Sequence, residues 1–510
     1  MGHKGFVYLV GAGPGDPGLV TLRARQVLGR AEAVVYDNLV HPRVLDWAPP
    51  EAERVPMGKI GHVHQHTQAE INQALIDRAR AGKVVVRLKG GDPAVFGRLG
   101  EEAEALAREG IPFEVVPGVT SASAAAVYAG FPLTHRDHAP SVTFVTGHRR
   151  RDGGEGPELD WGALARASGT LVVYMGIRTL PQVVEHLVAG GRDPATPVAV
   201  VERATWPGQR VVTGTLGDIV ERARAEGVRA PALVIVGGVV ELRARCDWLR
   251  WKPLFGKRVL VTRAAHQCAE FSELLRDHGA EAVELPLIEL RPTGHASGTE
   301  AALRRLFAYD WVILTSGNAV RFLFERLDAL GLDARAFGAA RVCAVGPRTA
   351  EALEARGIRP DVVPGKYVAE ALVEALAAHA ELRGASVLVP RAKEARDVIP
   401  NELTRLGAKV EVLPIYENVK PATHPAEGLA AVKEGALDLV TLASSSAARN
   451  YAELCRELGV PADRIPCAVI GPATEKTARA LGLPVAVVPE EYTLRGLVAA
   501  AERYFLGLGG

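Results

Sequence analysis

Short apolar runs alternate along the chain with segments in which apolar residues recur at helical spacing. The runs predict buried strands, and the Ala-, Leu- and Arg-rich segments between them predict helices. In the first half the strand-like runs are "FVYLVG", "AVVYD", "KVVVRLKGG" and "TLVVYMG". Thr67 and Glu70 have the spacing of a capping box and predict one helix start. The alternation is typical of α/β proteins with largely parallel sheets.

The alternation breaks once, at "RARCDWLRWKPLFG" (243–256), where Trp, Pro and Gly accumulate. A chain of 510 residues is also too long for one hydrophobic core. We therefore expect a first domain at 1–245, a linker at 246–255 and a second domain at 256–510.

The second half repeats its own pattern. "GKRVLVTR" (256–263) returns as "GASVLVPR" (384–391), and "DWVILTSGNAV" (310–320) returns as "DLVTLASSSAA" (438–448). The period is far too long for a solenoid, so the repeat indicates two homologous α/β lobes with a cleft between them.

Composition narrows the class of protein. The chain is 48% hydrophobic and 23% charged, and its net charge of +1 gives no attraction to nucleic acid or membranes as a whole. No apolar run has transmembrane length, and the N-terminus lacks the apolar core of a signal peptide. Five scattered cysteines without a C-x-x-C pair predict a reduced, cytoplasmic protein.

A glycine-rich turn follows the first strand, in "GAGPGDPG" (11–18). Asp16 stands where a dinucleotide-binding turn has its third glycine. Pro14 and Pro17 remove N–H donors that a phosphate would use. The turn predicts close approach to a cationic or zwitterionic ligand, whose ammonium group would meet the carboxylate of the second such turn, Asp92.

Two further features leave alternatives open. Asp37 ends a strand and is suited either to general-base catalysis or to an ordinary turn or helix cap. His62, His64 and His66 alternate, but no Cys or carboxylate cluster completes a tetrahedral set. We expect no metal site.

Residues 5–240 resemble the uroporphyrinogen-III C-methyltransferases of the tetrapyrrole methylase family. The resemblance is carried, in order, by "GAGPGDPGLVTLRA", "YDNLV", "VRLKGGDPAVFGRLGEE", "VPGVTSASAAAVYAGFPLTHR", "TLVVYMG" and "TPVAVVE". It implies two α/β lobes, S-adenosylmethionine and the macrocycle in the cleft between them, and a homodimer.

The resemblance also assigns roles to residues. It makes Asp37 the proton acceptor and Lys59 the proton donor. The implied cofactor contacts are Pro14, Gly90, Gly91, Asp92, Val95, Thr120, Ser121, Met175 and Ala204. Arg98, His135 and Arg136 are candidates for the substrate carboxylates, with surface or interdomain ion pairs as the equal alternative. Leu99, Ala204 and His41 depart from the family pattern, and the first two add bulk near the expected cleft.

The second half offers hydroxyls at strand ends and glycine turns before helices, without a His/Asp pair. These residues alone favour a non-catalytic binding module. Residues 256–500 nevertheless resemble uroporphyrinogen-III synthase, which closes hydroxymethylbilane with inversion of its last ring. The resemblance implies crossing connections, with lobes at 256–289 plus 421–500 and at 290–420. Tyr416 either assists departure of the hydroxyl or packs between the lobes. Candidate carboxylate contacts are Thr315, Ser316, Arg391, Ser445 and Thr474.

Together the halves predict a bifunctional enzyme that makes uroporphyrinogen III and methylates it at two carbons to precorrin-2. One alternative is another precorrin methyltransferase fused to a binding module. A nicotinamide-dependent oxidoreductase, with Asp37 on a ribose, is a second alternative, and Asp16 argues against it.

Overall fold

The structure, a computed structural model, describes residues 5–58, 66–147, 158–294, 297–364, 369–379, 381–395 and 397–507. Lys59, His62 and His64 lie outside these ranges. The chain divides into two compact units, Met1–Lys257 with His278–Glu281 and Arg258–Asp277 with Ala282–Gly510. The segment 246–255, expected as a linker, is part of the first unit.

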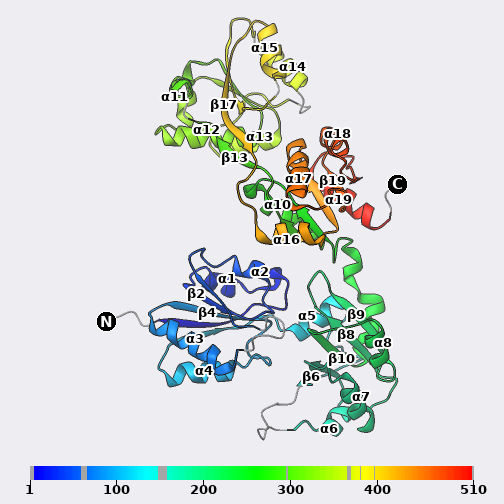
Figure 1. The fold of residues 1–510 in the computed structure, drawn as a ribbon. Coiled ribbons are helices and arrows are strands. Elements are labelled where there is room, and N and C mark those ends of the chain that lie inside the picture. Colours follow the sequence, from blue (N-terminus) through cyan, green and yellow to red (C-terminus); the bar gives the residue numbers. More distant parts are fainter. Residues whose placement is uncertain are drawn as a thin grey trace. The chain divides into compact units, whose positions relative to one another are not determined.

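The first lobe of unit 1 is a parallel sheet of order β3-β2-β4-β1-β5. Helices α1 and α2 pack on one face of it and α3 and α4 on the other (Figure 1). Thr67 and Glu70 form the expected capping box at the start of α3. The elements are β1 Phe6–Gly11, η1 Pro17–Leu19, α1 Leu22–Leu28, β2 Ala33–Tyr36, α2 Pro42–Leu45, β3 Glu53–Pro56, α3 Gln68–Arg80, β4 Val84–Lys89, α4 Leu99–Arg108 and β5 Phe113–Val116.

The second lobe of unit 1 is a mixed sheet of order β6-β7-β10-β8-β9, in which only β6 and β7 pair in parallel. Helix α5 packs on one face, and α6, α7 and α8 on the other. The elements are α5 Ser121–Tyr128, β6 Val142–Thr146, α6 Trp161–Arg166, β7 Thr170–Tyr174, α7 Leu180–Ala189, β8 Pro197–Glu202, β9 Arg210–Thr215, α8 Ile219–Ala225, β10 Ala232–Val236, η2 Gly238–Leu242, α9 Arg243–Cys246 and η3 Trp248–Trp251.

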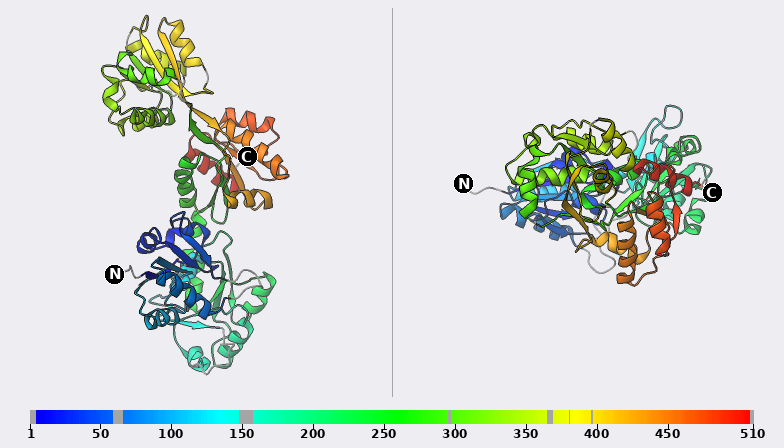
Figure 2. Two further views of the ribbon diagram at one scale, coloured as in Figure 1. Left: turned by 60° about the vertical axis from the view of Figure 1, so that its left-hand side comes forward. Right: turned by 90° about the horizontal axis from the view of Figure 1, so that it is seen from above.

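Unit 2 holds two sheets, β12-β11-β18-β19-β20 and β13-β17-β16-β14-β15. The chain starts in the first, crosses to the second and returns, so green and orange-to-red segments share one lobe in Figure 2. The elements up to residue 354 are β11 Arg258–Val261, α10 Ala265–Asp277, β12 Glu281–Glu284, β13 Glu289–Pro292, α11 Ser297–Arg304, η4 Leu306–Ala308, β14 Trp311–Leu314, α12 Gly317–Ala329, η5 Ala334–Phe337, β15 Arg341–Ala344 and α13 Pro347–Glu354. Those that follow are α14 Ala369–His379, β16 Ser386–Ala392, α15 Val398–Arg405, β17 Lys409–Val419, α16 Ala426–Glu434, β18 Leu439–Leu442, α17 Ser445–Leu458, β19 Cys467–Val469, α18 Pro472–Ala480, β20 Val485–Val487 and α19 Leu494–Phe505.

The sequence repeat corresponds to equivalent positions in the two sheets. Strand β11 is followed along its sheet by β18 and β19, as β16 is followed by β14 and β15. The helices after the central strands start alike: the hydroxyl of Ser316 accepts from the Ala319 N–H and that of Ser444 from the Ala447 N–H, each at 3.1 Å. The expected α/β class with a two-lobed second domain is thus confirmed.

Three general features of the described residues bear on function. No helix within the described residues is long and apolar enough to cross a membrane. The same residues contain no group of three or more His, Cys, Asp or Glu side chains arranged to hold a metal ion. All five cysteines are free, and only Cys246 is exposed.

Candidate functional sites

Three strand-end turns of unit 1 meet at backbone contact. Gly13 and Gly91 exchange hydrogen bonds, with N···O distances of 3.2 and 2.6 Å. A Cβ on Gly118 would lie 2.3 Å from the Gly91 carbonyl oxygen, and one on Gly11 would lie 2.7 Å from the Gly118 Cα. The turns after β1, β4 and β5 therefore need glycine where they touch. The carboxyl ends of parallel strands are the usual ligand-binding edge of such a sheet.

Asp92 joins two of these turns. Its carboxylate accepts the Ala94 N–H at 2.7 Å and the Gly118 N–H at 3.1 Å. Each oxygen accepts one backbone N–H and can accept a second hydrogen bond, so the expected contact of this carboxylate with a ligand ammonium group stays a prediction. Asp92 also fixes the cradle formed by the glycines.

Like Asp92, Asp16 holds neighbouring segments together through hydrogen bonds. Its Oδ1 accepts the Gly18 N–H at 2.7 Å, and its Oδ2 accepts the Tyr128 hydroxyl at 2.9 Å. Its own N–H donates to the Thr205 hydroxyl at 3.0 Å. The residue that separates this turn from a dinucleotide fingerprint thus ties the turn to the second lobe of the unit.

Non-glycine residues with left-handed backbone gather around the same edge. Among the described residues these are Phe96, Arg98, Met175, Arg203 and Thr205, with φ between 48° and 69°. All lie in turns after β4, β7 and β8. Such conformations cost about 1–3 kcal/mol each and cluster at binding and catalytic sites. Met175 and Phe96 are also large apolar side chains left 50% and 42% exposed, as expected of a surface that a ligand covers.

The remaining cofactor candidates lie in the turns after β1, β4 and β8 and at the start of α5. The hydroxyls of Thr120 and Tyr174 lie 2.6 Å apart at the start of α5, and Ser121 begins that helix. Val95 and Ala204 pack against the core under the second sheet. Pro14 and Gly90 belong to the turns after β1 and β4.

Of the departures from the family pattern, Leu99 packs into the core between the first sheet and α3, so its bulk is accommodated there. His41 stacks on Trp206 with ring centroids 4.8 Å apart.

Asp37 follows β2, beside the end of β4, and lies near a buried charge cluster. Glu102 is fully buried and accepts hydrogen bonds from Arg87 Nε at 3.1 Å and Lys89 Nζ at 2.7 Å. Burial raises the pKa of Asp37, while Arg87 and Lys89 act in the opposite direction. The same burial lowers the pKa of Lys89. A carboxylate with a raised pKa at a ligand-binding edge is suited to accept a proton.

The three candidates for substrate carboxylates differ in their partners, and Arg98 lies in the same connection as Gly91, between β4 and α4. Arg98 forms a two-point contact with Glu101, at 2.7 and 2.6 Å. The His135 Nδ1 accepts the Asp137 N–H at 3.1 Å within a turn. Arg136 is exposed.

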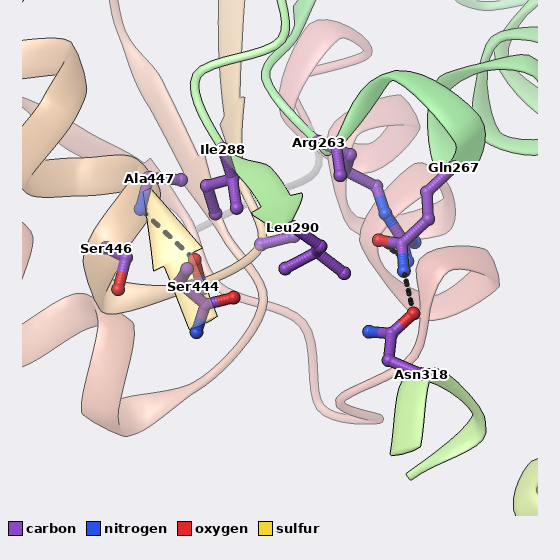
Figure 3. A pocket seen from close by; sticks show the side chains of 11 residues that line it. Arg263, Gln267, Ile288, Leu290, Asn318, Ser444, Ser446 and Ala447 are labelled. Carbon is purple, nitrogen blue, oxygen red and sulfur yellow. Dashed lines mark hydrogen bonds between the residues drawn. The ribbon is translucent and has the colours of Figure 1, made fainter. Parts of the chain in front are cut away.

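Unit 2 contains a cavity of about 170 Å³ between its lobes. Arg263, Gln267 and Asn318 lie on one side of Leu290, and Ser444 and Ser446 lie on the other (Figure 3). The Gln267 amide donates to the Asn318 Oδ1 at 3.3 Å. Asn418, Ile288, Ala264, Ala443 and Ala447 complete the lining. The polar groups are those that bind carboxylates: a guanidinium, amides and hydroxyls.

The structure places the sequence candidates of this unit around the lobes rather than in one group. Ser445 donates to the Ala473 carbonyl at 3.1 Å, and Thr474 is buried in α18. Arg391 is buried and bonded to Asp397. Thr315 and Ser316 lie at the end of β14, before α12. None of these five residues lines the cavity that the described residues form at Arg263.

Tyr416 packs inside its own lobe and not between the lobes. Its ring stacks on Phe322 at 5.1 Å, and it belongs to the hydrophobic core there. Its hydroxyl lies 3.2 Å from that of Ser316. Burial raises its pKa, and the Ser316 hydroxyl opposes this.

Sequence reasoning missed the cavity residues Arg263, Gln267, Asn318 and Asn418. Arg263 ends the same repeated motif as Arg391, so the repeat marked both arginines. The two arginines differ in burial: Arg263 lines the cavity, whereas Arg391 lies in the protein interior.

Comparison with known proteins gives two family matches. The model of the tetrapyrrole (corrin/porphyrin) methylases matches residues 7–220, and that of uroporphyrinogen-III synthase HemD matches residues 269–499. Each match lies within one of the two resemblances drawn from the sequence, which are thereby confirmed as family assignments.

Individual relatives cover the chain to different extents. The porphyrin biosynthesis protein HemD of Ruminiclostridium josui is 36% identical over 97% of both chains. The uroporphyrinogen-III C-methyltransferase of Bacillus subtilis is 40% identical over 70% of this chain and 74% of its own. An S-adenosyl-L-methionine-dependent uroporphyrinogen III methyltransferase of Methanosarcina barkeri is 52% identical over 47% of this chain and 94% of its own. The chain therefore belongs, through its first unit, to the tetrapyrrole methylases and, through its second, to the uroporphyrinogen-III synthases, joined in one polypeptide of tetrapyrrole biosynthesis.

Proposed function

We propose that unit 2 cyclises hydroxymethylbilane to uroporphyrinogen III and that unit 1 methylates this product twice, with S-adenosylmethionine, to precorrin-2. The joint presence of both families in one chain supports the pairing, because the first reaction makes the substrate of the second. The relative from Methanosarcina barkeri, named for its use of S-adenosyl-L-methionine on uroporphyrinogen III, supports the specificity of unit 1.

The observation that carries the proposal for unit 1 is the glycine-lined edge with Asp37 beside it. The turns at Gly91, Gly118 and Gly13 hold one another in close backbone contact, and this rigid edge is proposed to receive the zwitterionic end of S-adenosylmethionine. When bound, the cofactor supplies a sulfonium methyl group. Its transfer to a nucleophilic pyrrole carbon depends mainly on alignment, which rigid turns provide.

Asp37 then removes the proton from the methylated carbon. Its raised pKa brings it nearer to the operating pH, where general bases are most effective. Lys59 is proposed as the proton donor on the family resemblance alone. Arg98, His135 and Arg136 are proposed to meet the substrate carboxylates.

In unit 2 the cavity at Arg263 is proposed as the part of the site that holds substrate carboxylates. Its 170 Å³ is below the roughly 300–1,000 Å³ of ordinary small-molecule sites, so a linear tetrapyrrole extends beyond it. Ring closure needs the chain ends to be brought together more than it needs a strong acid or base. Tyr416 is proposed to assist loss of the bilane hydroxyl, together with Ser316, its neighbour at 3.2 Å.

We also propose that the protein is cytoplasmic and forms a homodimer through its methyltransferase unit. Light scattering of the full chain and of unit 1 variants measures the second point directly. A mass of one chain at working concentration excludes the dimer.

The test of function is anaerobic mass spectrometry after incubation with hydroxymethylbilane and S-adenosylmethionine. A type-III macrocycle with two added methyl groups is expected. If methylation requires ready-made uroporphyrinogen III, unit 2 is a binding module and not a synthase. If unit 1 methylates another precorrin but not uroporphyrinogen III, its substrate has been misassigned.

A further inference from the structure

A closed ring of hydrogen bonds surrounds the end of α5 in unit 1. The Tyr128 hydroxyl donates to Asp16 Oδ2 at 2.9 Å, and the Asp16 N–H donates to the Thr205 hydroxyl at 3.0 Å. The Thr205 N–H donates to the Gln209 Oε1 at 2.8 Å, and the Gln209 amide donates to the Tyr128 carbonyl at 2.8 Å. The ring thus joins the turn after β1 to the turn after β8 through Tyr128.

Tyr128 is well suited to hold this ring. Its side chain is half-buried, and burial together with the Asp16 carboxylate raises its pKa, so the hydroxyl remains a donor at neutral pH. A hydrogen bond to a charged acceptor contributes more than one between neutral groups. Thr205 itself has a φ of 69°, so one member of the ring is held in a strained conformation.

The segment 243–256 packs against Tyr128 from the other side. The Trp248 Nε1 donates to the Val127 carbonyl at 2.8 Å, and its ring meets that of Tyr128 edge-on at 5.3 Å. Phe255 places its ring 6.4 Å from the same tyrosine. Arg243 bonds to the Ala129 carbonyl, and a Cβ on Gly130 would lie 2.7 Å from the Asp247 Cα. The segment that the sequence pattern marked as a linker is therefore fitted closely to the end of α5.

We propose that Tyr128 and Trp248 are positioning residues for the turn after β1 (residues 11–18), and that those residues of the segment 243–256 that pack on the end of α5 support the methyltransferase site. This inference rests on the proposed use of S-adenosylmethionine by unit 1. Trp248 fixes the position of Tyr128, Tyr128 fixes Asp16, and Asp16 fixes the turn that follows β1.

The experiment compares three full-length variants: Tyr128→Phe, Trp248→Ala and Trp251→Ala. Tyr128→Phe removes only the hydroxyl. Trp251 belongs to the same segment but is 74% exposed, so its variant is the matched control. Affinity for S-adenosylhomocysteine is measured by calorimetry, KM for uroporphyrinogen III by methyl transfer, and unit 2 by bilane cyclisation.

For Tyr128→Phe we expect affinity for S-adenosylhomocysteine to fall about tenfold, the effect of losing one charge-assisted hydrogen bond. Trp248→Ala is expected to lower it by at least as much. The KM for uroporphyrinogen III and the cyclisation rate of Tyr128→Phe stay unchanged. Trp251→Ala matches the wild type throughout.

The inference is overturned if Tyr128→Phe binds S-adenosylhomocysteine within twofold of wild type. It is also overturned if the KM for uroporphyrinogen III and the cyclisation rate change together with the affinity, because that pattern means general destabilisation. If wild-type protein binds S-adenosylhomocysteine but does not methylate uroporphyrinogen III, the proposed substrate is wrong, while the binding data still decide the positioning role.

Discussion

The two candidate sites are built in opposite ways. In unit 1 the ligand-binding edge consists of backbone in close contact, left-handed non-glycine residues and a buried charge cluster. In unit 2 the cavity is lined by side chains from helices, strands and connections of both lobes, among them the serine-capped helices α12 and α17. The contrast suggests different demands: a transferred methyl group requires exact alignment, whereas a flexible polyanionic chain requires carboxylate contacts.

The largest effect is expected at Asp37. Asp37→Asn keeps the shape but removes the base, and general-base groups typically contribute 10²–10⁴-fold. Methyl transfer should fall by about that factor, while bilane cyclisation by the same preparation is unchanged. A loss below about tenfold would show that solvent or another residue takes the proton.

The pH profile sharpens the same point. Because the carboxylate is the active form and burial raises its pKa, methyl transfer is present above that pKa and is lost as the pH falls through it. The acid limb of the rate should therefore lie above the usual Asp value of about 3.9. An acid limb at or below that value, measured in buffers that keep the protein folded, contradicts a base whose pKa is raised by desolvation.

The next largest effect is expected at the buried charge cluster of Glu102, Arg87 and Lys89. Glu102→Gln leaves Arg87 and Lys89 without their carboxylate in the interior, which typically costs 3–5 kcal/mol. Chemical unfolding should show unit 1 destabilised by about that amount and unit 2 unaffected. Glu104→Gln, on the exposed face of the same helix, is the control and should change nothing measurable. Equal stability of the two variants means that the cluster is dispensable.

The close contact between the glycine turns of unit 1 predicts a smaller effect on methyl transfer and on stability. Gly118→Ala places a Cβ 2.3 Å from the Gly91 carbonyl, and overpacking of this kind costs about 1–3 kcal/mol. Methyl transfer should decrease together with the thermal midpoint of unit 1. Gly100→Ala, in helix α4 with nothing within 4 Å, should be neutral or stabilising. If both alanines behave alike, the three turns are looser than described.

Arg263 tests the second site. Arg263→Gln removes a guanidinium from the cavity, and the KM for hydroxymethylbilane should rise about tenfold. Steady-state cyclisation measures this, with Arg335→Gln, at an arginine that is 91% exposed in the same unit, as the control. An unchanged KM would place the carboxylate contacts elsewhere in the unit.

The smallest effect is expected at Tyr416. Tyr416→Phe keeps the stacking on Phe322 and removes one hydrogen bond, worth about 0.5–1.5 kcal/mol. Cyclisation should slow by no more than about tenfold. A loss above 100-fold would make this hydroxyl the main acid of the reaction and not an assisting group, and the two sites would then differ less than the comparison suggests.

Local signals predicted much of the fold. The capping box at Thr67 and Glu70, the apolar strand runs and the long repeat are all visible within short windows, and each corresponds to a described element or lobe. Convergence of the glycine turns also follows from strand polarity. These features depend on neighbours in sequence or on topology that the pattern itself fixes.

The parts that could not be predicted depend on distant partners. Asp16 meets Tyr128 across 112 positions and Thr205 across 189, so nothing near it indicates that it joins two lobes. Burial likewise separates Arg263 from Arg391, which occupy the same place in the repeat. Composition and spacing carry no information on which of two equivalent arginines faces a cavity.

The crossing of the chain in unit 2 has a consequence for genetics. Strand β18 lies in the middle of the sheet that β11 and β12 begin, although more than 150 positions separate them in sequence. A nonsense mutation after β17 would leave every strand of the second sheet encoded, yet it would remove β18, β19 and β20 from the first. Late truncations of the gene therefore damage the lobe of unit 2 whose first strands are translated before the other lobe, and only the second lobe is encoded by one continuous stretch of the gene.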